Sequence, residues 1–195
     1  MNFKKKAAKV IRIGTIPPIA VAVLLLMLYF FKEGVFASVW ELLISMAFLA
    51  LIPILAYPIA WVVPKLKQMG RDGERNLSFA ACVLGYLLAV IYGYTSGVSK
   101  GLTVIYLTYF ISVVLLTVIN KAIKFRASGH SCCVFGPMVV ICYEFGLVYA
   151  IPCAILFAAV AWSSLFLKRH TLKELIAGAA VSSIAFGISL LIVGG

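Results

Sequence analysis

The sequence predicts an all-α protein, a polytopic bundle of helices that cross a membrane. Its 195 residues are 64% hydrophobic and only 12% charged, which is typical of a chain dissolved in lipid rather than in water. The apolar residues form runs far longer than the roughly 10 residues of a barrel strand, and they do not alternate with polar ones, which excludes a β-barrel. The loops between the runs are short, so we expect a single membrane domain over residues 1–195.

The apolar runs predict about seven spans, with six as the alternative. A helix needs about 20 apolar residues to cross the hydrocarbon core, and most of the runs approach or exceed this length. The expected spans lie near residues 14–31, 36–63, 77–95, 101–119, 130–147, 148–167 and 173–193.

The basic residues orient this bundle. Of the 17 Lys and Arg residues, all but Lys32 and Lys100 lie in the N-terminal segment or in the second, fourth and sixth connections. The positive-inside rule therefore predicts that these segments face the cytoplasm, in the inner or plasma membrane of the cell. The net charge of +11 is explained by this topology and by attraction to anionic membrane lipids, so we expect no nucleic-acid partner.

The five cysteines do not indicate a metal or disulfide framework. They lie inside apolar runs without paired Cys-x-x-Cys spacing, where a cysteine acts as a small hydrophobic residue. We expect neither a metal site nor a cofactor.

Both histidines lie in polar loops on the basic side of the predicted bundle. His130 follows Ser128 and Gly129, and His170 precedes Glu174 by four residues, a spacing that brings imidazole and carboxylate within hydrogen-bond reach on a helix. A carboxylate on one ring nitrogen leaves the other nitrogen as a nucleophile, and a second histidine can protonate a leaving oxygen.

Cations surround the two histidines in the sequence. Lys124, Arg126, Lys168 and Arg169 lie beside them, and backbone N–H groups at two helix starts add to a site suited to an anion such as phosphate. The polar segment 65–76, which ends in Arg75 and Asn76, is expected on the same face, either as an ordinary basic loop or as a cap over the site.

The two histidine segments together resemble the type 2 phosphatidic acid phosphatase superfamily of membrane lipid phosphatases. Ser128-Gly129-His130-Ser131 is similar to the second motif of that family, and Ser163, His170 and Glu174 have the spacing of the third. The order of the motifs and the 40-residue separation of the histidines also match. The flanking Arg126 and Trp162 resemble a branch with small members, and the similarity covers about residues 120–180.

The resemblance implies a metal-independent phosphoric ester hydrolase. By analogy, His170 is the nucleophile that forms a phosphohistidine, Glu174 orients it, and His130 is the acid for the leaving alcohol and then the base for water. The phosphate oxygens would be bound by Lys124, Arg126, Ser128, the Gly129 amide and, more weakly, Ser163. The implied substrate is a phosphomonoester or diphosphate of a lipid: phosphatidate, phosphatidylglycerophosphate or a polyprenyl (di)phosphate.

The sequence departs from the family pattern at three positions. Ala127 replaces a proline, Glu174 replaces an aspartate, and Ser164 replaces the arginine that grips the phosphoryl oxygens in the family. Arg126, Arg169 or Arg75 could replace that arginine. Two alternatives therefore remain open: a lipid phosphotransferase on the same scaffold, and a catalytically silent relative that binds anionic lipids.

Overall fold

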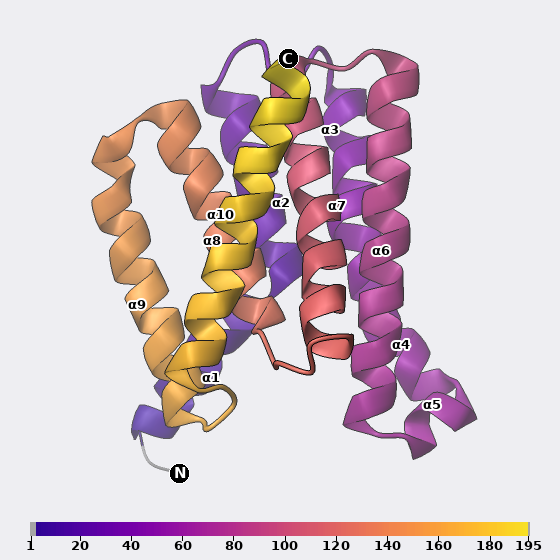
Figure 1. Cartoon of the computed structure of the whole chain (residues 1–195), viewed down its shortest axis with the longest axis vertical. Coiled ribbons are helices and arrows are strands. Elements are labelled where there is room, and N and C mark those ends of the chain that lie inside the picture. Colours follow the sequence, from indigo (N-terminus) through magenta and orange to yellow (C-terminus); the bar gives the residue numbers. More distant parts are fainter. Residues whose placement is uncertain (1–2, 195) are drawn as a thin grey trace.

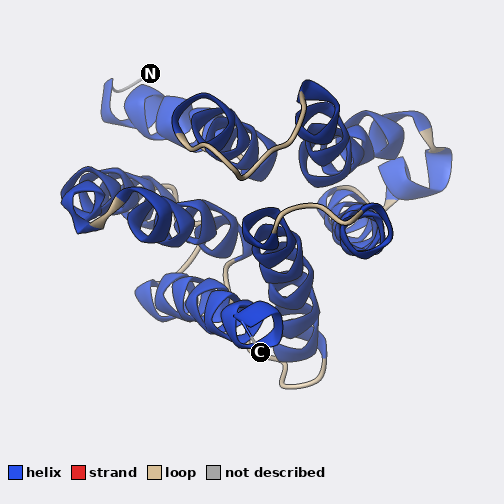
Figure 2. Ribbon diagram, turned by 90° about the horizontal axis from the view of Figure 1, so that it is seen from above, coloured by secondary structure: helices blue, strands red, loops and turns tan. Residues whose placement is uncertain are grey.

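The computed structural model describes residues 3–194, apart from the side chains of residues 71 and 72, and all elements in this part of the chain are helical. Figures 1 and 2 show helices standing side by side, joined by loops. The α-helices are α1 Phe3–Gly14, α2 Pro17–Phe31, α3 Val39–Met46, α4 Ile52–Val62, α5 Pro64–Gln68, α6 Arg71–Ser96, α7 Lys100–Lys121, α8 Gly129–Phe145, α9 Ala150–Phe166 and α10 Leu172–Gly194, with a π-helical turn η1 at Ala47–Leu51 and a 3₁₀ turn η2 at Leu147–Tyr149.

The structure confirms an all-helical membrane bundle, but it does not confirm seven spans. Among the described residues, five segments are long and apolar enough to cross a membrane: Val39–Val62, Gly73–Ser96, Lys100–Lys121, Leu147–Phe166 and Leu172–Gly194. The pair α1 and α2 makes a sixth if it counts as one span despite a bend of 56°. The helix α8 has 17 residues and, at about 1.5 Å per residue, is shorter than the roughly 30 Å hydrocarbon core.

Prolines explain the bend between α1 and α2. Gly14 ends α1, and Pro17 and Pro18 open α2, where a missing N–H group costs nothing because the first turn has no partner for it. Residues before a proline avoid the helical conformation, so the first helix cannot run straight into the second. The basic helix α1 therefore takes its own direction and packs against α9, with Ala8 fully buried.

The core of the bundle lies around α7, the most buried of the five spans. Its apolar side chains pack against α6 and α10, and Tyr106 makes a hydrogen bond of 2.6 Å with Ser45 of α3. In lipid this contact gives two buried hydroxyl groups a partner that the solvent cannot supply.

The basic segments gather at one end of the bundle. Figure 1 shows α1, the corner formed by α5, the α7–α8 loop and the α9–α10 loop at the same end, and the C-terminus at the other. This arrangement brings the two histidine-bearing loops, which are far apart in the sequence, to one end of the molecule.

Candidate functional site

A Schellman motif at the end of α9 sets the position of His170. The N–H of Arg169 donates to the carbonyl of Ser164 at 2.9 Å, and the N–H of Lys168 donates to Leu165 at 3.0 Å. This motif requires a left-handed residue between the helix and the following chain. Lys168 takes that conformation, with φ of 51°. The chain therefore changes direction abruptly at the end of α9, and this turn sets where His170 lies.

A capping box at the start of α10 holds the carboxylate that faces His170. Thr171 Oγ1 accepts a hydrogen bond from the Glu174 N–H at 3.3 Å, and Glu174 Oε2 accepts one from the Thr171 N–H at 3.2 Å. The same Oε2 lies 2.8 Å from Nδ1 of His170, so the contact predicted from the spacing is present. Because a carboxylate accepts, Nδ1 carries the proton, and Nε2 of the neutral ring keeps a free electron pair.

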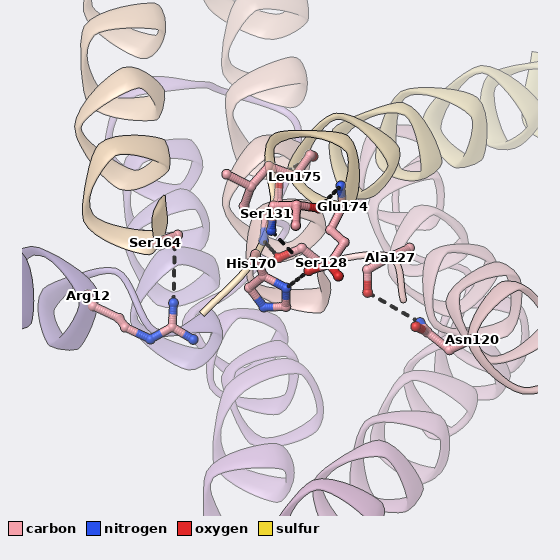
Figure 3. Close-up of polar contacts among 10 residues, drawn as sticks. Arg12, Asn120, Ala127, Ser128, Ser131, Ser164, His170, Glu174 and Leu175 are labelled. Atoms are coloured by element: carbon pink, nitrogen blue, oxygen red, sulfur yellow. Dashed lines mark hydrogen bonds and ion pairs between the residues drawn. The ribbon is translucent and has the colours of Figure 1, made fainter. Parts of the chain in front are cut away.

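The start of α8 is bonded directly to the start of α10. The Ser128 N–H donates to the carbonyl of Glu174 at 2.9 Å, and the Ser131 hydroxyl donates to the carbonyl of Leu175 at 2.7 Å. At Gly178 the helices lie so close that an added Cβ would stand 2.3 Å from the Ser128 carbonyl oxygen. Figure 3 shows these contacts around His170. The His130 and His170 segments therefore form one unit.

His130, the second residue of α8, contacts Thr15, the residue that directly follows α1. Its Nε2 lies 3.3 Å from the hydroxyl oxygen of Thr15, and that hydroxyl donates its hydrogen to the carbonyl of Ile11 at 2.8 Å. Since a hydroxyl has one hydrogen, the Thr15 oxygen acts as acceptor toward His130. This contact assigns the ring proton of neutral His130 to Nε2.

A cavity of about 1040 Å³ joins the two histidines. Its described lining contains a single carboxylate, Glu74, whose Oε1 accepts a hydrogen bond of 2.9 Å from the indole of Trp61. Its cationic lining residues are Arg12, Arg75, Lys121, Lys124, Arg126 and Arg169. Such an excess of positive charge favours an anionic ligand.

The pKa of the His170 imidazole is lowered from its ordinary value. Burial is the main cause, the hydrogen bond to Glu174 acts in the opposite direction, and the cations of Arg126 and Arg12 add to the lowering. The His170 side chain is only 12% exposed. The ring is therefore neutral at neutral pH, the form that a nucleophile requires.

The structure brings most of the predicted site residues together. His130, His170 and the predicted binding residues Lys124, Arg126, Gly129, Arg169 and Arg75 line the cavity. Glu174 is not part of the cavity lining, and its carboxylate contacts the His170 ring at Nδ1.

Two predicted phosphate ligands have other roles. Ser128 and Ser163 are fully buried. The Ser128 hydroxyl oxygen accepts from the Ser131 N–H at 3.2 Å as the cap of α8, and the Ser163 hydroxyl donates to the Val160 carbonyl of its own helix at 2.9 Å. Neither residue lines the cavity, so the structure does not bring these two side chains to the site with the others, and their contact with phosphate stays a prediction.

Sequence reasoning missed three residues at the ends of helices: Arg12 in the last turn of α1, Thr15 directly after α1, and Thr171 directly before α10. Arg12 donates from Nη1 to the Ser164 hydroxyl at 3.2 Å, across 152 positions of the chain, and Thr15 contacts His130. No local pattern indicates either contact. Thr171 could have been found, because Thr171 and Glu174 have the threonine-to-glutamate spacing of a capping box.

Among the described side chains, no group of three His, Cys, Asp or Glu residues is placed to hold a metal ion. Comparisons with models of protein families, with curated proteins and with solved structures found no match for this chain.

Proposed function

We propose that this protein is a lipid phosphate phosphatase that works through a phosphohistidine intermediate. The observation that carries the proposal is the hydrogen bond of 2.8 Å between Glu174 and His170, which lines a cavity together with His130 and, among the described residues, six cationic side chains. An oriented neutral imidazole, a second imidazole and an anion-binding lining are the parts that metal-independent phosphoryl transfer requires.

In the proposed first step, Nε2 of His170 attacks phosphorus. The N–P bond forms as the bond from phosphorus to the leaving oxygen breaks, and that oxygen takes a proton from Nε2 of His130 in its doubly protonated, cationic form, which the bound anionic substrate favours. Glu174 stabilises the positive charge that develops on the His170 ring. Because Nε2 of His130 is bonded to Thr15 in the resting site, the leaving oxygen has to replace Thr15 as its acceptor.

In the second step, water replaces the alcohol. His130 takes a proton from the water, the oxygen attacks phosphorus, the N–P bond breaks, and inorganic phosphate leaves. Lys124, Arg126 and Arg169 balance the charge on the phosphoryl oxygens throughout.

The rest of the cavity supports a lipid rather than a soluble ester as substrate. Besides the cations, its lining includes Pro17, Pro18, Pro53, Phe79, Val113 and Leu116. An amphiphile could place its phosphate on the cations and its hydrocarbon along these side chains. We propose phosphatidate, phosphatidylglycerophosphate and polyprenyl (di)phosphates as the candidates, with the site facing the cytoplasm.

Phosphate release from these lipids, by purified protein in detergent, tests the proposal. We expect release from at least one of them and a loss on the order of 10⁴-fold or more in His170→Ala. Lys173→Ala is the matched control, because Lys173 is an exposed neighbour outside the cavity lining. Acid-labile labelling of His170 by a ³²P-labelled substrate would support the intermediate directly.

The same assay separates the alternatives. Transfer of the label to an added alcohol in preference to water would identify a phosphotransferase. Turnover in His170→Ala equal to that of the unchanged protein would refute the phosphohistidine scheme, and phosphate binding without any turnover would favour a silent lipid-binding protein.

A further inference from the structure

The first helix, α1, has two different apolar faces. On the inner face, Ala8 is fully buried and Ile11 packs against side chains of α8 and α9. On the outer face, Phe3, Val10 and Ile13 keep 82%, 69% and 65% of their surface exposed. Spacings of seven and three residues place these three on one side of a helix. The outer face of α1 therefore presents three large apolar side chains to the surroundings of the bundle.

Lysines surround this outer face. The helix contains Lys4, Lys5, Lys6 and Lys9, all exposed, and no acidic residue. Exposed apolar side chains together with a dense positive charge are typical of a helix that lies in the surface of a membrane. The apolar side chains of such a helix insert between the lipids, and the long lysine stems carry the ammonium groups to the headgroups.

The charge of α1 excludes a deeper position in the bilayer. The helix has 12 residues, and its four lysines would lose their water in the hydrocarbon core at a high cost in free energy. The next helix, α2, has 15 residues and none of them is charged. The bend of 56° between the two helices lets α2 enter the bilayer while α1 lies at its surface.

The place of α1 in the fold agrees with this position. Figure 1 shows α1 at the end of the bundle where the basic loops gather, and Figure 2 shows the N-terminal helix at the edge of the bundle rather than at its centre. The main packing partner of α1 is α9, on the inner face. At this end of a bundle that spans a membrane, the outer face borders on lipid headgroups.

We propose that α1 binds the anionic surface of the membrane, with its outer face inserted between the lipids and its lysines at the lipid phosphates. This inference does not rest on the proposed function. Because Thr15 directly follows α1, the lipid surface that holds α1 also supports the contact of 3.3 Å between Thr15 and His130.

Photocrosslinking of the purified full-length protein in lipid vesicles tests this position. A benzophenone amino acid, which reacts with nearby C–H bonds, replaces Val10 on the outer face or Lys5, which lies about 140° away around the helix. Both residues are exposed, so both variants keep the packing of α1 on α9. In vesicles of phosphatidylcholine and phosphatidylglycerol, we expect severalfold more lipid adducts from position 10 than from position 5, counted by mass spectrometry. The same probe in place of Ile13 should behave like the probe at position 10.

The role of the lysines is tested with the probe at position 10. Removal of phosphatidylglycerol from the vesicles should lower the yield of lipid adducts severalfold, and so should the combined substitutions Lys5→Gln and Lys9→Gln, because the attraction to the anionic surface is lost. The combination of Lys65→Gln and Lys67→Gln is the matched control, since these two exposed lysines belong to α5 at the same end of the bundle. It should leave the yield unchanged.

Three results would overturn the inference. They are equal yields of lipid adducts from positions 10 and 5, adducts at position 10 that join two copies of the protein in place of lipid, and a yield at position 10 that depends neither on phosphatidylglycerol nor on the lysines. The experiment uses no substrate, so a protein that releases no phosphate from any lipid would contradict the proposed function alone.

Discussion

At the scale of single residues, the carboxylate of Glu174 accepts two hydrogen bonds that have different structural roles. Its Oε2 accepts from the Thr171 N–H, which caps α10, and from Nδ1 of His170, which selects the ring tautomer. The carboxylate thus couples the start of a helix to the orientation of the proposed nucleophile. Any shift of the helix start would change the direction of the free electron pair on His170.

The pH dependence of activity should reflect this coupling. In the proposed mechanism the active form of His170 is neutral, so activity should be lost as the pH falls through the pKa of His170, which burial places below the ordinary 6.5. Glu174 raises that pKa, so Glu174→Gln should move the acid limb of the pH–rate profile to still lower pH. The rate above the limb should fall by up to about 10⁴-fold, because the amide no longer fixes the tautomer.

Glu174→Asp is the control for this pH experiment, because it keeps a carboxylate. It should retain more activity than Glu174→Gln and a limb nearer to that of the unchanged protein. A limb that moves to higher pH in Glu174→Gln would contradict the assignment of the limb to His170.

At the scale of elements, the site depends on the crossing of α8 and α10. Gly178 allows the crossing, because there is no room for a side chain between α10 and the Ser128 carbonyl. The backbone bonds from Ser128 and Ser131 to α10 then hold the two helix starts in fixed register. Close helix approach at small residues is a common way to pack helices in membranes.

Gly178→Ala should therefore destabilise the protein. The new methyl group would meet a backbone oxygen at 2.3 Å, and the helices would have to separate, at a cost of about 1 to 3 kcal/mol. We expect a lower midpoint of thermal unfolding in detergent and reduced phosphate release, because His170 and His130 would move apart.

Gly187→Ala is the matched control for this packing experiment. Gly187 lies in the same helix, but an added Cβ there would meet nothing within 4 Å. It should leave stability unchanged or raise it by up to about 1 kcal/mol, since alanine favours helix over glycine. Equal effects of the two substitutions would show that the crossing does not depend on Gly178.

At the scale of the whole molecule, the charge distribution and the site share one end. The basic segments that predict the cytoplasmic side are the segments that carry Arg12, Lys124, Arg126, Arg169 and the two histidine loops. The proposed site should therefore take its substrate from the cytoplasmic leaflet, where anionic lipids are abundant.

Cysteine labelling in intact cells checks this sidedness. Lys168→Cys, beside His170, should resist a membrane-impermeant thiol reagent until the cells are permeabilised, whereas Glu33→Cys, in the α2–α3 connection, should react at once. Both positions are exposed. The protein with its five native cysteines is the background control. Immediate labelling at Lys168→Cys would place the site on the outer face.

The sequence by itself determined the class of the protein and the parts of the site that depend on near neighbours. Composition and run length determine that helices cross a membrane, because lipid requires every backbone group to be bonded within its own helix. The pairing of His170 with Glu174 follows from a spacing of four residues, and the cap at Thr171 follows from a spacing of three.

Only the tertiary structure decided which distant residues complete the site and how many helices are long enough to cross. Arg12 contacts Ser164 because the bend between α1 and α2 and the packing of α1 on α9 bring the two residues together. Neither the bend angle nor the packing partner of α1 can be predicted from the spacing of residues in the sequence. The hydroxyl groups of Ser128 and Ser163 bond to the backbone because their helix ends lie buried in the bundle. The apolar run near 130–147 contains a helix of only 17 residues, because Ser128 caps it and Gly146 ends it. These contacts depend on where helices meet in space, which local patterns do not specify.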